Sequence, residues 1–223
     1  LFPYTTLFRS SAMTEWDRIT QVVLPEKLES ICEYAFYNCA ALESVVFPEG
    51  LKTIGVLAFK GCALTEVTLP KSIETIENNA FLNCEQIERV NYRGTLTDWM
   101  KIEFAGTYSN PLAFGGAFFV SGEEVKGDLF IDGVETVKSN AFYGLKLDSV
   151  TLGESVKEVK QNAFGTGEAV PLKRLVILGK SVNLVNVAMG YRLTKDTEVF
   201  YKGTAAEMKE NVTGNDAPYY KHC

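Results

Sequence analysis

Thiols, one imidazole and scattered carboxylates are the groups in this sequence that could do chemistry. The cysteines are Cys32, Cys39, Cys62, Cys84 and Cys223. A cysteine nucleophile or a serine triad needs a histidine base, and the single histidine, His222, is next to the last residue. A zinc site needs Cys and His clustered at short spacing, which this sequence lacks. We therefore expect no catalytic residues, no metal site and no cofactor, and we expect that the protein is not an enzyme.

The spacing of three of the cysteines indicates packing. Cys39, Cys62 and Cys84 are 23 and 22 residues apart, whereas a disulfide framework has an even count and compact spacing. Three thiols in stacked coils could approach one another, but a regular column of this kind is typical of small buried apolar side chains. We therefore favour packing over metal binding.

Composition and charge exclude several classes of partner. The net charge of −6 leaves no basic surface for nucleic acid. No apolar run reaches the ~18 residues of a membrane helix, so we expect no membrane insertion in this chain. Gly115-Gly116 and Gly165-Thr166-Gly167 lack the glycine patterns that hold phosphate. The hydrophobic content of 46% favours a folded, soluble protein.

A period of about 22 residues organises the chain. The segments that align cover residues 19–42, 43–64, 65–87, 126–147, 148–172 and 173–193. An Ala-Phe pair marks each of them: Ala35-Phe36, Ala58-Phe59, Ala80-Phe81, Ala141-Phe142, Ala163-Phe164 and, as a divergent copy, Ala188-Met189. Such regularity predicts a stack of similar coils that bury like residues against like.

Each repeat has two halves. The first alternates apolar and polar residues, as at Val67 and Leu69, and in three repeats it ends at a proline such as Pro70, so it predicts a short strand. The second half has apolar residues three or four apart, as at Leu51, Ile54 and Ala58, which favours a helical or irregular return. We expect the five Phe of the Ala-Phe pairs to stack in one column, each contributing roughly 1.5–3 kcal/mol. The asparagines before these pairs are expected to satisfy backbone groups at the turn: Asn79, Asn140 and Asn162.

Residues 88–125 break the period. They carry Tyr92, a Gly-Thr pair and Trp99, and the segment 197–212 repeats this pattern with Met208 in place of Trp99. A strand, a Gly-Thr turn and a short helix beginning around Thr97 fit both copies, with a threonine cap. After the first copy we expect a hairpin around Ser121-Gly122, whose second strand restarts the repeats. Trp99 and Tyr92 are expected to pack this module onto the repeats, with carbohydrate stacking as the alternative.

These motifs together resemble the BspA-like class of leucine-rich repeats, found in surface proteins of gut and oral bacteria. The resemblance covers roughly residues 19–223 and implies an α/β repeat solenoid. In it, a right-handed leucine-rich-repeat superhelix carries a parallel β-sheet on the concave face, short helical or irregular convex segments and a small inserted strand-helix-hairpin module. It further implies a cell-surface or extracellular location, with the targeting signal outside this fragment.

The domain organisation that we expect has five segments. Residues 1–10, LFPYTTLFRS, resemble the translation of a sequencing-adapter scar of metagenomic reading frames and are set aside as a non-native leader. Residues 11–92 and 126–196 form two blocks of repeats, separated by the inserted module at 93–125. Residues 197–223 form a second, partial module or a C-terminal cap.

The outward positions of the predicted long strands form the candidate binding face. They are Ser44, Val46, Glu66, Thr68, Arg89, Asn91, Ser149 and Thr151. Solenoids bind partners on such faces, although this one shows no cluster of Trp, Tyr and Arg, and a merely soluble face fits the sequence about as well. The resemblance implies an adhesin-type protein-interaction module with a host, matrix or bacterial surface protein as partner. A structural spacer, or an accessory carbohydrate-binding module with glycan as partner, remains the alternative.

Overall fold

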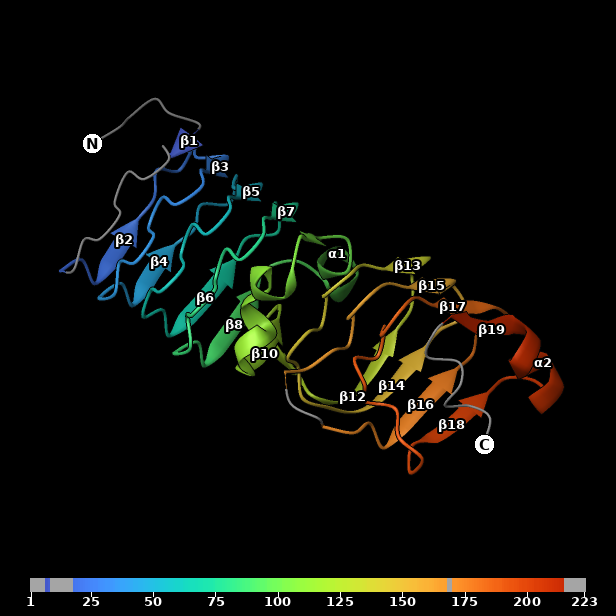
Figure 1. The fold of residues 1–223 in the computed structure, drawn as a ribbon. Helices are drawn as coiled ribbons and strands as arrows, with labels where there is room; N and C mark the ends of the chain where they lie inside the picture. Colours follow the sequence, from blue (N-terminus) through green and yellow to red (C-terminus); the bar gives the residue numbers. More distant parts are fainter. Residues whose placement is uncertain (1–6, 9–17, 168–169, 215–223) are drawn as a thin grey trace. The chain divides into compact units, whose positions relative to one another are not determined.

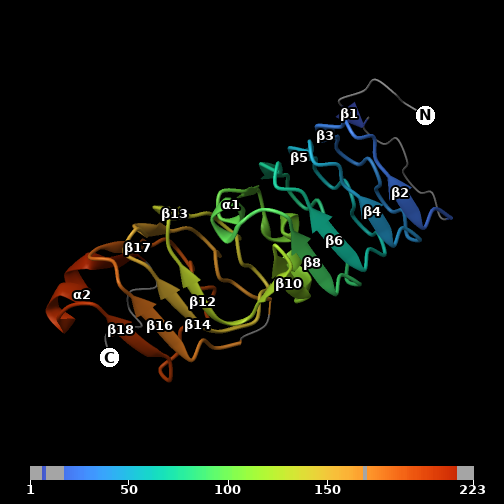
Figure 2. The same cartoon turned by 180° about the vertical axis from the view of Figure 1, so that it is seen from behind.

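Each repeat of the sequence forms one coil of a parallel β-solenoid, with a long strand and a short strand in each coil (Figure 1). The computed structural model describes residues 7–8, 18–167 and 170–214. The chain divides into two compact units between Glu124 and Val125, and the strands of each unit form their own β-sheets, three in the first unit and two in the second (Figure 2).

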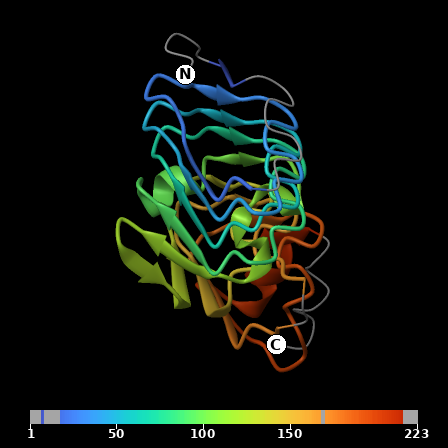
Figure 3. The same cartoon turned by 90° about the vertical axis from the view of Figure 1, so that its left-hand side faces the viewer.

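In the first unit the coils stack one upon the next (Figure 3). Its long strands are β2 (Gln21–Val23), β4 (Ser44–Val46), β6 (Glu66–Leu69), β8 (Arg89–Tyr92) and β10 (Ala117–Val120). Its short strands form one sheet from β1 (Leu7–Phe8) through β3 (Ser30–Ile31), β5 (Thr53–Ile54) and β7 (Thr75–Ile76) to β9 (Glu103–Phe104). The long-strand sheet is interrupted between β4 and β6, which belong to separate sheets.

The second unit repeats this arrangement with four coils. Its long strands are β12 (Gly127–Ile131), β14 (Leu147–Leu152), β16 (Arg174–Ile177) and β18 (Glu198–Tyr201), in that order in one sheet. Its short strands are β13 (Thr136–Val137), β15 (Glu158–Val159), β17 (Val182–Leu184) and β19 (Val212–Gly214). The neighbouring strands of both sheets pair in parallel, as expected for coils that all run in the same direction.

The Ala-Phe pairs lie in the core, as the period predicts. Phe36, Phe59 and Phe81 stack with ring centroids 5.0 and 5.6 Å apart in the first unit. Phe142 and Phe164 stack at 5.4 Å in the second. All five rings are fully buried, so the phenylalanine column is confirmed within each unit.

The return half of each repeat is irregular, which is one of the two expected forms. It contains a two-residue strand such as β5, followed by a turn in which residues adopt left-handed backbone conformations. Leu51, Ile54 and Ala58 are buried because they line successive corners of the coil. Their spacing of three and four residues reflects those corners, and the left-handed residues that follow prevent a continuous α-helix.

The residue before each Ala-Phe pair adopts a left-handed backbone conformation, and asparagine occupies this position in three coils. Asn79, Asn140 and Asn162 have φ angles of 59°, 60° and 55°, a region that asparagine tolerates better than most residues. Leu57 and Val187 stand at the same position of their coils with φ angles of 56° and 52°. The turn is therefore set by the coil and is adopted even where the residue does not favour it.

Residues 93–125, expected to be an inserted module, build a further coil of the first unit. The chain runs from β8 through helix α1 (Leu96–Trp99) into β9, and β9 extends the short-strand sheet. The 3-10 helices η1 (Thr107–Ser109) and η2 (Pro111–Phe114) then lead to β10. The backbone N–H of Phe81 donates to the carbonyl of Tyr108 (2.9 Å), so η1 takes the place of an Ala-Phe turn.

The second copy of the Gly-Thr pattern lies at the same place in its own coil. Helix α2 (Ala205–Asn211) connects β18 to β19, as α1 connects β8 to β9. Thr95 and Thr204 cap the two helices through capping boxes with Asp98 and Glu207. The expected strand, turn and threonine-capped helix are confirmed in both copies.

Two further segments complete the description. Strand β11 (Glu123–Val125) neighbours β10 across the two-residue loop Ser121-Gly122, which gives the expected hairpin. The second strand of the hairpin was expected to restart the repeats, but they restart in the separate strand β12, whose first residue, Gly127, has a φ angle of 66°. At the other end, β1 pairs with β3, so part of the segment set aside from the fold takes part in a sheet.

Candidate interaction surface

The candidate residues all lie on long strands. We call the outward-pointing side chains of these strands the long-strand face. Six of the eight, on β4, β6 and β8, lie in the first unit, and Ser149 and Thr151 lie on β14 of the second. The sequence therefore placed the candidates on the right elements but divided them between two units.

Four of the six in the first unit are joined by hydrogen bonds. The Asn91 amide Nδ2 donates to Glu66 Oε1 (2.7 Å) and to Thr68 Oγ1 (3.1 Å). Arg89 Nε donates to Asn91 Oδ1 (3.1 Å). The cross-strand pairs Glu66–Arg89 and Thr68–Asn91 bring these groups into register, so β6 and β8 present an ordered polar patch.

Arg89 also lies on an aromatic ring. Its guanidinium carbon is 3.7 Å from the centre of the Phe119 ring on β10. Stacking of a guanidinium on a ring and a hydrogen bond at Nε hold the side chain in one orientation. Arg89 is nevertheless exposed to solvent.

The remaining two candidates of the first unit line a depression at the break between β4 and β6. Its volume is about 380 Å³, and Ser44, Val46, Glu66 and Thr68 contribute to its wall. Val46 is 44% exposed. Arg93, which forms an ion pair with Glu49, closes one side.

In the second unit the two candidates differ. Ser149 is only 7% exposed, and its hydroxyl donates to Asp128 Oδ1 (2.5 Å), so it is a poor contact residue. Thr151 is half-buried in a row of directly paired positions, Phe130–Thr151–Val176–Phe200. Phe130 and Phe200 are 55% and 50% exposed, so this row carries an aromatic side chain at each end.

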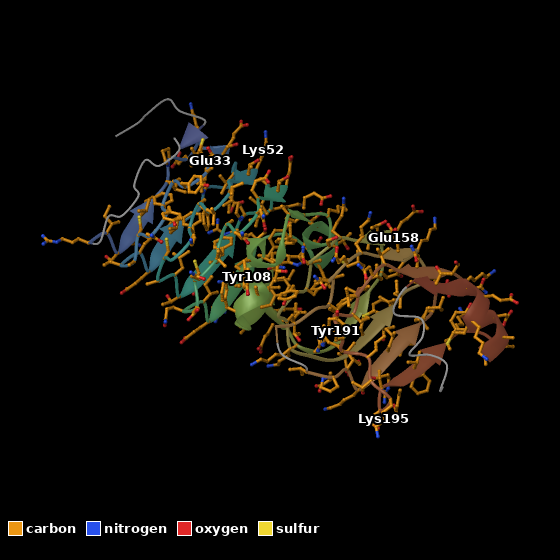
Figure 4. The ribbon with its side chains drawn as sticks, viewed as in Figure 1. Glu33, Lys52, Tyr108, Glu158, Tyr191 and Lys195 are labelled. Atoms are coloured by element: carbon orange, nitrogen blue, oxygen red, sulfur yellow. The ribbon has the colours of Figure 1, made fainter. Side chains whose placement is uncertain are left out.

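The aromatic positions of this face are what the sequence interpretation missed. Among the described residues, the large apolar side chains with high exposure are Val23, Val46, Tyr108, Phe130, Tyr191 and Phe200. Four of these are on long strands, while Tyr108 lies in the 3-10 helix η1 and Tyr191 in a turn (Figure 4). The sequence contains a signal for these outward positions, because Phe130 and Phe200 alternate with buried or half-buried residues along β12 and β18.

A second depression lies at the edge of the second unit. Its volume is about 560 Å³, and it is lined by Glu154, Lys157, Leu178, Lys180, Ser181, Asn183 and Lys202. Lys157 and Lys202 form ion pairs with Glu135 and Glu154. These pairs neutralise much of the positive charge there.

The cysteine column packs in the core, as expected. Cys39, Cys62 and Cys84 are buried, and the thiols of Cys62 and Cys84 donate to the carbonyls of Phe36 and Phe59 at 3.1 and 2.9 Å. Burial raises the pKa of the Cys84 thiol to about 12 and raises the pKa of the Cys62 thiol above its usual range. Such thiols stay protonated and are poor nucleophiles and poor metal ligands at neutral pH. Within the described ranges, no group of three or more His, Cys, Asp and Glu is placed to hold a metal ion.

Trp99 and Tyr92 pack in the interior of the coil that contains helix α1, which we call the helical coil. Their burial excludes them as an open platform on which a sugar could stack. Trp99 is fully buried against Tyr92, Phe104 and Phe118, with centroid distances of 4.6–5.3 Å. Tyr92 is 2% exposed, and burial is the main cause that raises its pKa to about 12. His222 and Cys223 lie outside the described residues. In the described part of the chain, no helix is long and apolar enough to cross a membrane.

Solved structures similar to this chain are bacterial repeat proteins. A leucine-rich repeat protein from Bacteroides ovatus is 16% identical over 88% of this chain, with a TM-score of 0.42, and the chain spans 57% of its length. The pneumococcal vaccine antigen PcpA is 12% identical, with a TM-score of 0.35, over 93% of this chain and 82% of the antigen. A leucine rich cell surface protein from Faecalibacterium prausnitzii is 16% identical, with a TM-score of 0.28, over 88% of this chain and 83% of that protein.

The comparison with curated proteins finds no match. The comparison with family models matches the BspA type leucine rich repeat region in six copies, over residues 7–116 and 121–183. These residues include every strand from β1 to β16 except β10, and the five Ala-Phe turns described above. The chain belongs to the family of BspA type leucine-rich repeat proteins.

Proposed function

We propose that this chain is a non-enzymatic, adhesin-type interaction module of a bacterial cell-surface or secreted protein, and that it binds other proteins through the long-strand face. Leucine-rich repeats are generally protein-interaction modules, and family membership supports a surface location. The observation that carries the proposal is the concentration of exposed apolar side chains on this face. Exposed apolar groups rimmed by polar ones are typical of protein contact sites.

Two features support the non-enzymatic part of the proposal. Burial raises the pKa of the Cys62 and Cys84 thiols, so both stay protonated at neutral pH and are poor nucleophiles. The polar groups on β6 and β8 bond to one another, and Glu66 and Arg89 among them are exposed to solvent, whereas reaction sites exclude water.

Binding of the whole chain to purified host matrix proteins, host cells, bacterial cells and a glycan array tests the proposal. Val46→Lys on β4 and Phe200→Lys on β18 place a charge on the long-strand face, and Thr75→Lys on β7 is the matched control on the short-strand side. We expect protein binding that the first two variants weaken and the control retains.

The other outcomes identify the alternatives. Binding to glycans alone would indicate the accessory carbohydrate-binding module. No binding to any member of the panel would favour the structural spacer. Loss of binding in the Thr75→Lys variant alone would place the contact on the wrong sheet and contradict the proposal.

A further inference from the structure

The two units carry the same pair of side chains at the same place on the long-strand face. Arg89 is the first residue of β8, and it lies over Phe119, the third residue of β10 in the next coil. Arg174 is the first residue of β16, and it lies over Phe200, the third residue of β18, at 5.7 Å. Each arginine thus reaches diagonally across to the ring of the following coil.

The residue directly opposite the arginine differs between the units. Arg174 pairs in register with Glu198, and its Nε donates to Glu198 Oε2 (3.3 Å). Arg89 pairs in register with Ala117, which has no charge to offer. The second unit therefore supplies an internal carboxylate beside its stacked arginine, and the first unit leaves that position open.

Arg89 has no carboxylate partner among the described residues. Its Nε bonds to Asn91, and the neighbouring Glu66 carboxylate instead accepts from Asn91 and Thr68. The Nη1 and Nη2 groups are thus left for solvent or for a ligand. A guanidinium already held by a ring and one hydrogen bond loses little freedom on binding, and its remaining N–H groups match the two oxygens of a carboxylate.

We propose that Arg89, Phe119 and the open position at Ala117 form a subsite for a carboxylate side chain of a protein partner, in an acidic segment that crosses the long-strand face of the first unit. Glu198 in the second unit shows the chemistry that the subsite accepts. The proposal names the partner chemistry of the proposed binding function and rests on it. A protein segment is favoured over an acidic glycan because this repeat family generally binds proteins.

The probe is a hexaglutamate peptide with an acetylated N-terminus and an amidated C-terminus, titrated into the ¹⁵N-labelled full chain at low salt. The Nε–Hε signal of Arg89, assigned by its loss in Arg89→Gln, reports binding. We expect a saturable shift of this signal, and a response weaker by about tenfold or more with the uncharged hexaglutamine peptide, blocked in the same way. Raising the salt concentration should weaken the shift as well.

Two pairs of variants separate the subsite from a general effect of charge. Ala117→Glu supplies the internal carboxylate and should abolish the response, whereas Ala117→Gln, of the same size, should retain it. Glu198→Ala should remove the internal carboxylate beside Arg174, so that the Arg174 signal begins to respond to the peptide. Circular dichroism of each variant confirms that it is folded.

Each result decides the matter. No response at Arg89, an equal response to the glutamine peptide, or no gain at Arg174 in Glu198→Ala would overturn the subsite. An equal or stronger response to a hyaluronan hexasaccharide, whose carboxylates belong to a glycan, would overturn the choice of a protein segment. If the subsite fails while Val46→Lys and Phe200→Lys still abolish protein binding, the proposed function stands and this inference alone falls.

Discussion

Arg192 takes the place of a cysteine in the core of the second unit. It follows Met189 by three residues, as Cys39, Cys62 and Cys84 follow their phenylalanines. The thiols of Cys62 and Cys84 donate to the phenylalanine carbonyl of the previous coil, and Arg192 Nη1 likewise approaches the carbonyl of Phe164 (3.4 Å). The longer side chain continues to carbonyls that a thiol cannot reach.

Those carbonyls belong to Val170, Leu145 and Leu147, at 3.0, 3.1 and 2.7 Å from the guanidinium nitrogens. Arg192 is fully buried, and burial lowers its pKa to about 10, so it remains charged at neutral pH. Hydrogen bonds from this charged donor satisfy backbone carbonyls of the two preceding coils at once. We infer that Arg192 ties Val170 to the core of the second unit.

The first prediction concerns this arginine. Arg192→Met should lower the free energy of unfolding by about 3 kcal/mol, because several buried carbonyls lose their donor. Arg192→Lys keeps the positive charge but loses the planar guanidinium with its several N–H donors. We therefore expect an intermediate loss of unfolding free energy. Denaturant unfolding measures both, and a loss below about 1 kcal/mol for the methionine variant would contradict this role.

The second prediction concerns the Cys84 thiol. Its pKa is raised from 9.0 to about 12 on folding, so between these values the unfolded chain loses the proton and the folded chain keeps it. The stability due to this group is therefore complete below pH 9 and decreases as the pH rises, by at most about 1.4 kcal/mol per pH unit. The difference in unfolding free energy between the wild type and Cys84→Ala should shrink from pH 8.5 to 10.5. A constant difference would show that the thiolate is not disfavoured in the fold.

At the scale of elements, the turns and the helices each depend on a particular residue type. The turn before each Ala-Phe pair requires a left-handed backbone conformation, which asparagine tolerates at Asn162 and which the β-branched Val187 adopts against its preference. The helices α1 and α2 are short, so their caps satisfy a large share of their free N–H groups.

The third prediction therefore exchanges residues at the turn. Val187→Asn should raise the free energy of unfolding by about 1 kcal/mol, since asparagine tolerates the left-handed conformation. Val185→Asn, two residues earlier, is outside the left-handed positions and should not stabilise the chain. Thermal unfolding compares the two, and equal effects would show that the backbone angle is not the cause.

The fourth prediction removes a helix cap. Thr95 accepts from the Asp98 N–H at 3.1 Å and closes the capping box of α1. Thr95→Ala should cost about 1 kcal/mol. Thr97→Ala, within the same helix, removes no cap and should cost little or nothing. An equal loss of stability in both variants would mean that removal of any threonine hydroxyl, and not loss of the cap, causes the effect.

At the scale of the whole molecule, two separate phenylalanine stacks support two units. Phe81 is stacked on Phe59 and lies next to the helical coil of the first unit. In a solenoid each coil contacts its neighbours only, so damage should remain local.

The fifth prediction uses this locality. Phe81→Ala should cost roughly 3–5 kcal/mol of stability in the first unit, because a fully buried ring leaves a cavity. Hydrogen exchange should speed up in β5, β7 and β9, while β14 and β16 keep their protection. Faster exchange throughout both units would mean that the two stacks unfold as one.

Much of this fold can be predicted from the sequence. The period, the inward positions of the long strands, the buried phenylalanine and cysteine columns and the threonine-capped helices all follow from local patterns. They do so because each coil repeats the same contacts, so the pattern found in one repeat also predicts the structure of its neighbours. The elements that carry the candidate surface were predictable for the same reason.

Three features depended on the tertiary structure. The short-strand sheet forms because two residues per coil meet their copies in the next coil, a signal too brief to detect along the chain. Arg192 is satisfied in the core because the two preceding coils present carbonyls to its guanidinium. Arg89 faces Ala117 across 28 residues while Arg174 faces Glu198 across 24, so the helical coil shifts the pairing and decides which arginine remains open. Register between coils of unequal length is a property of the stack, and no single repeat contains it.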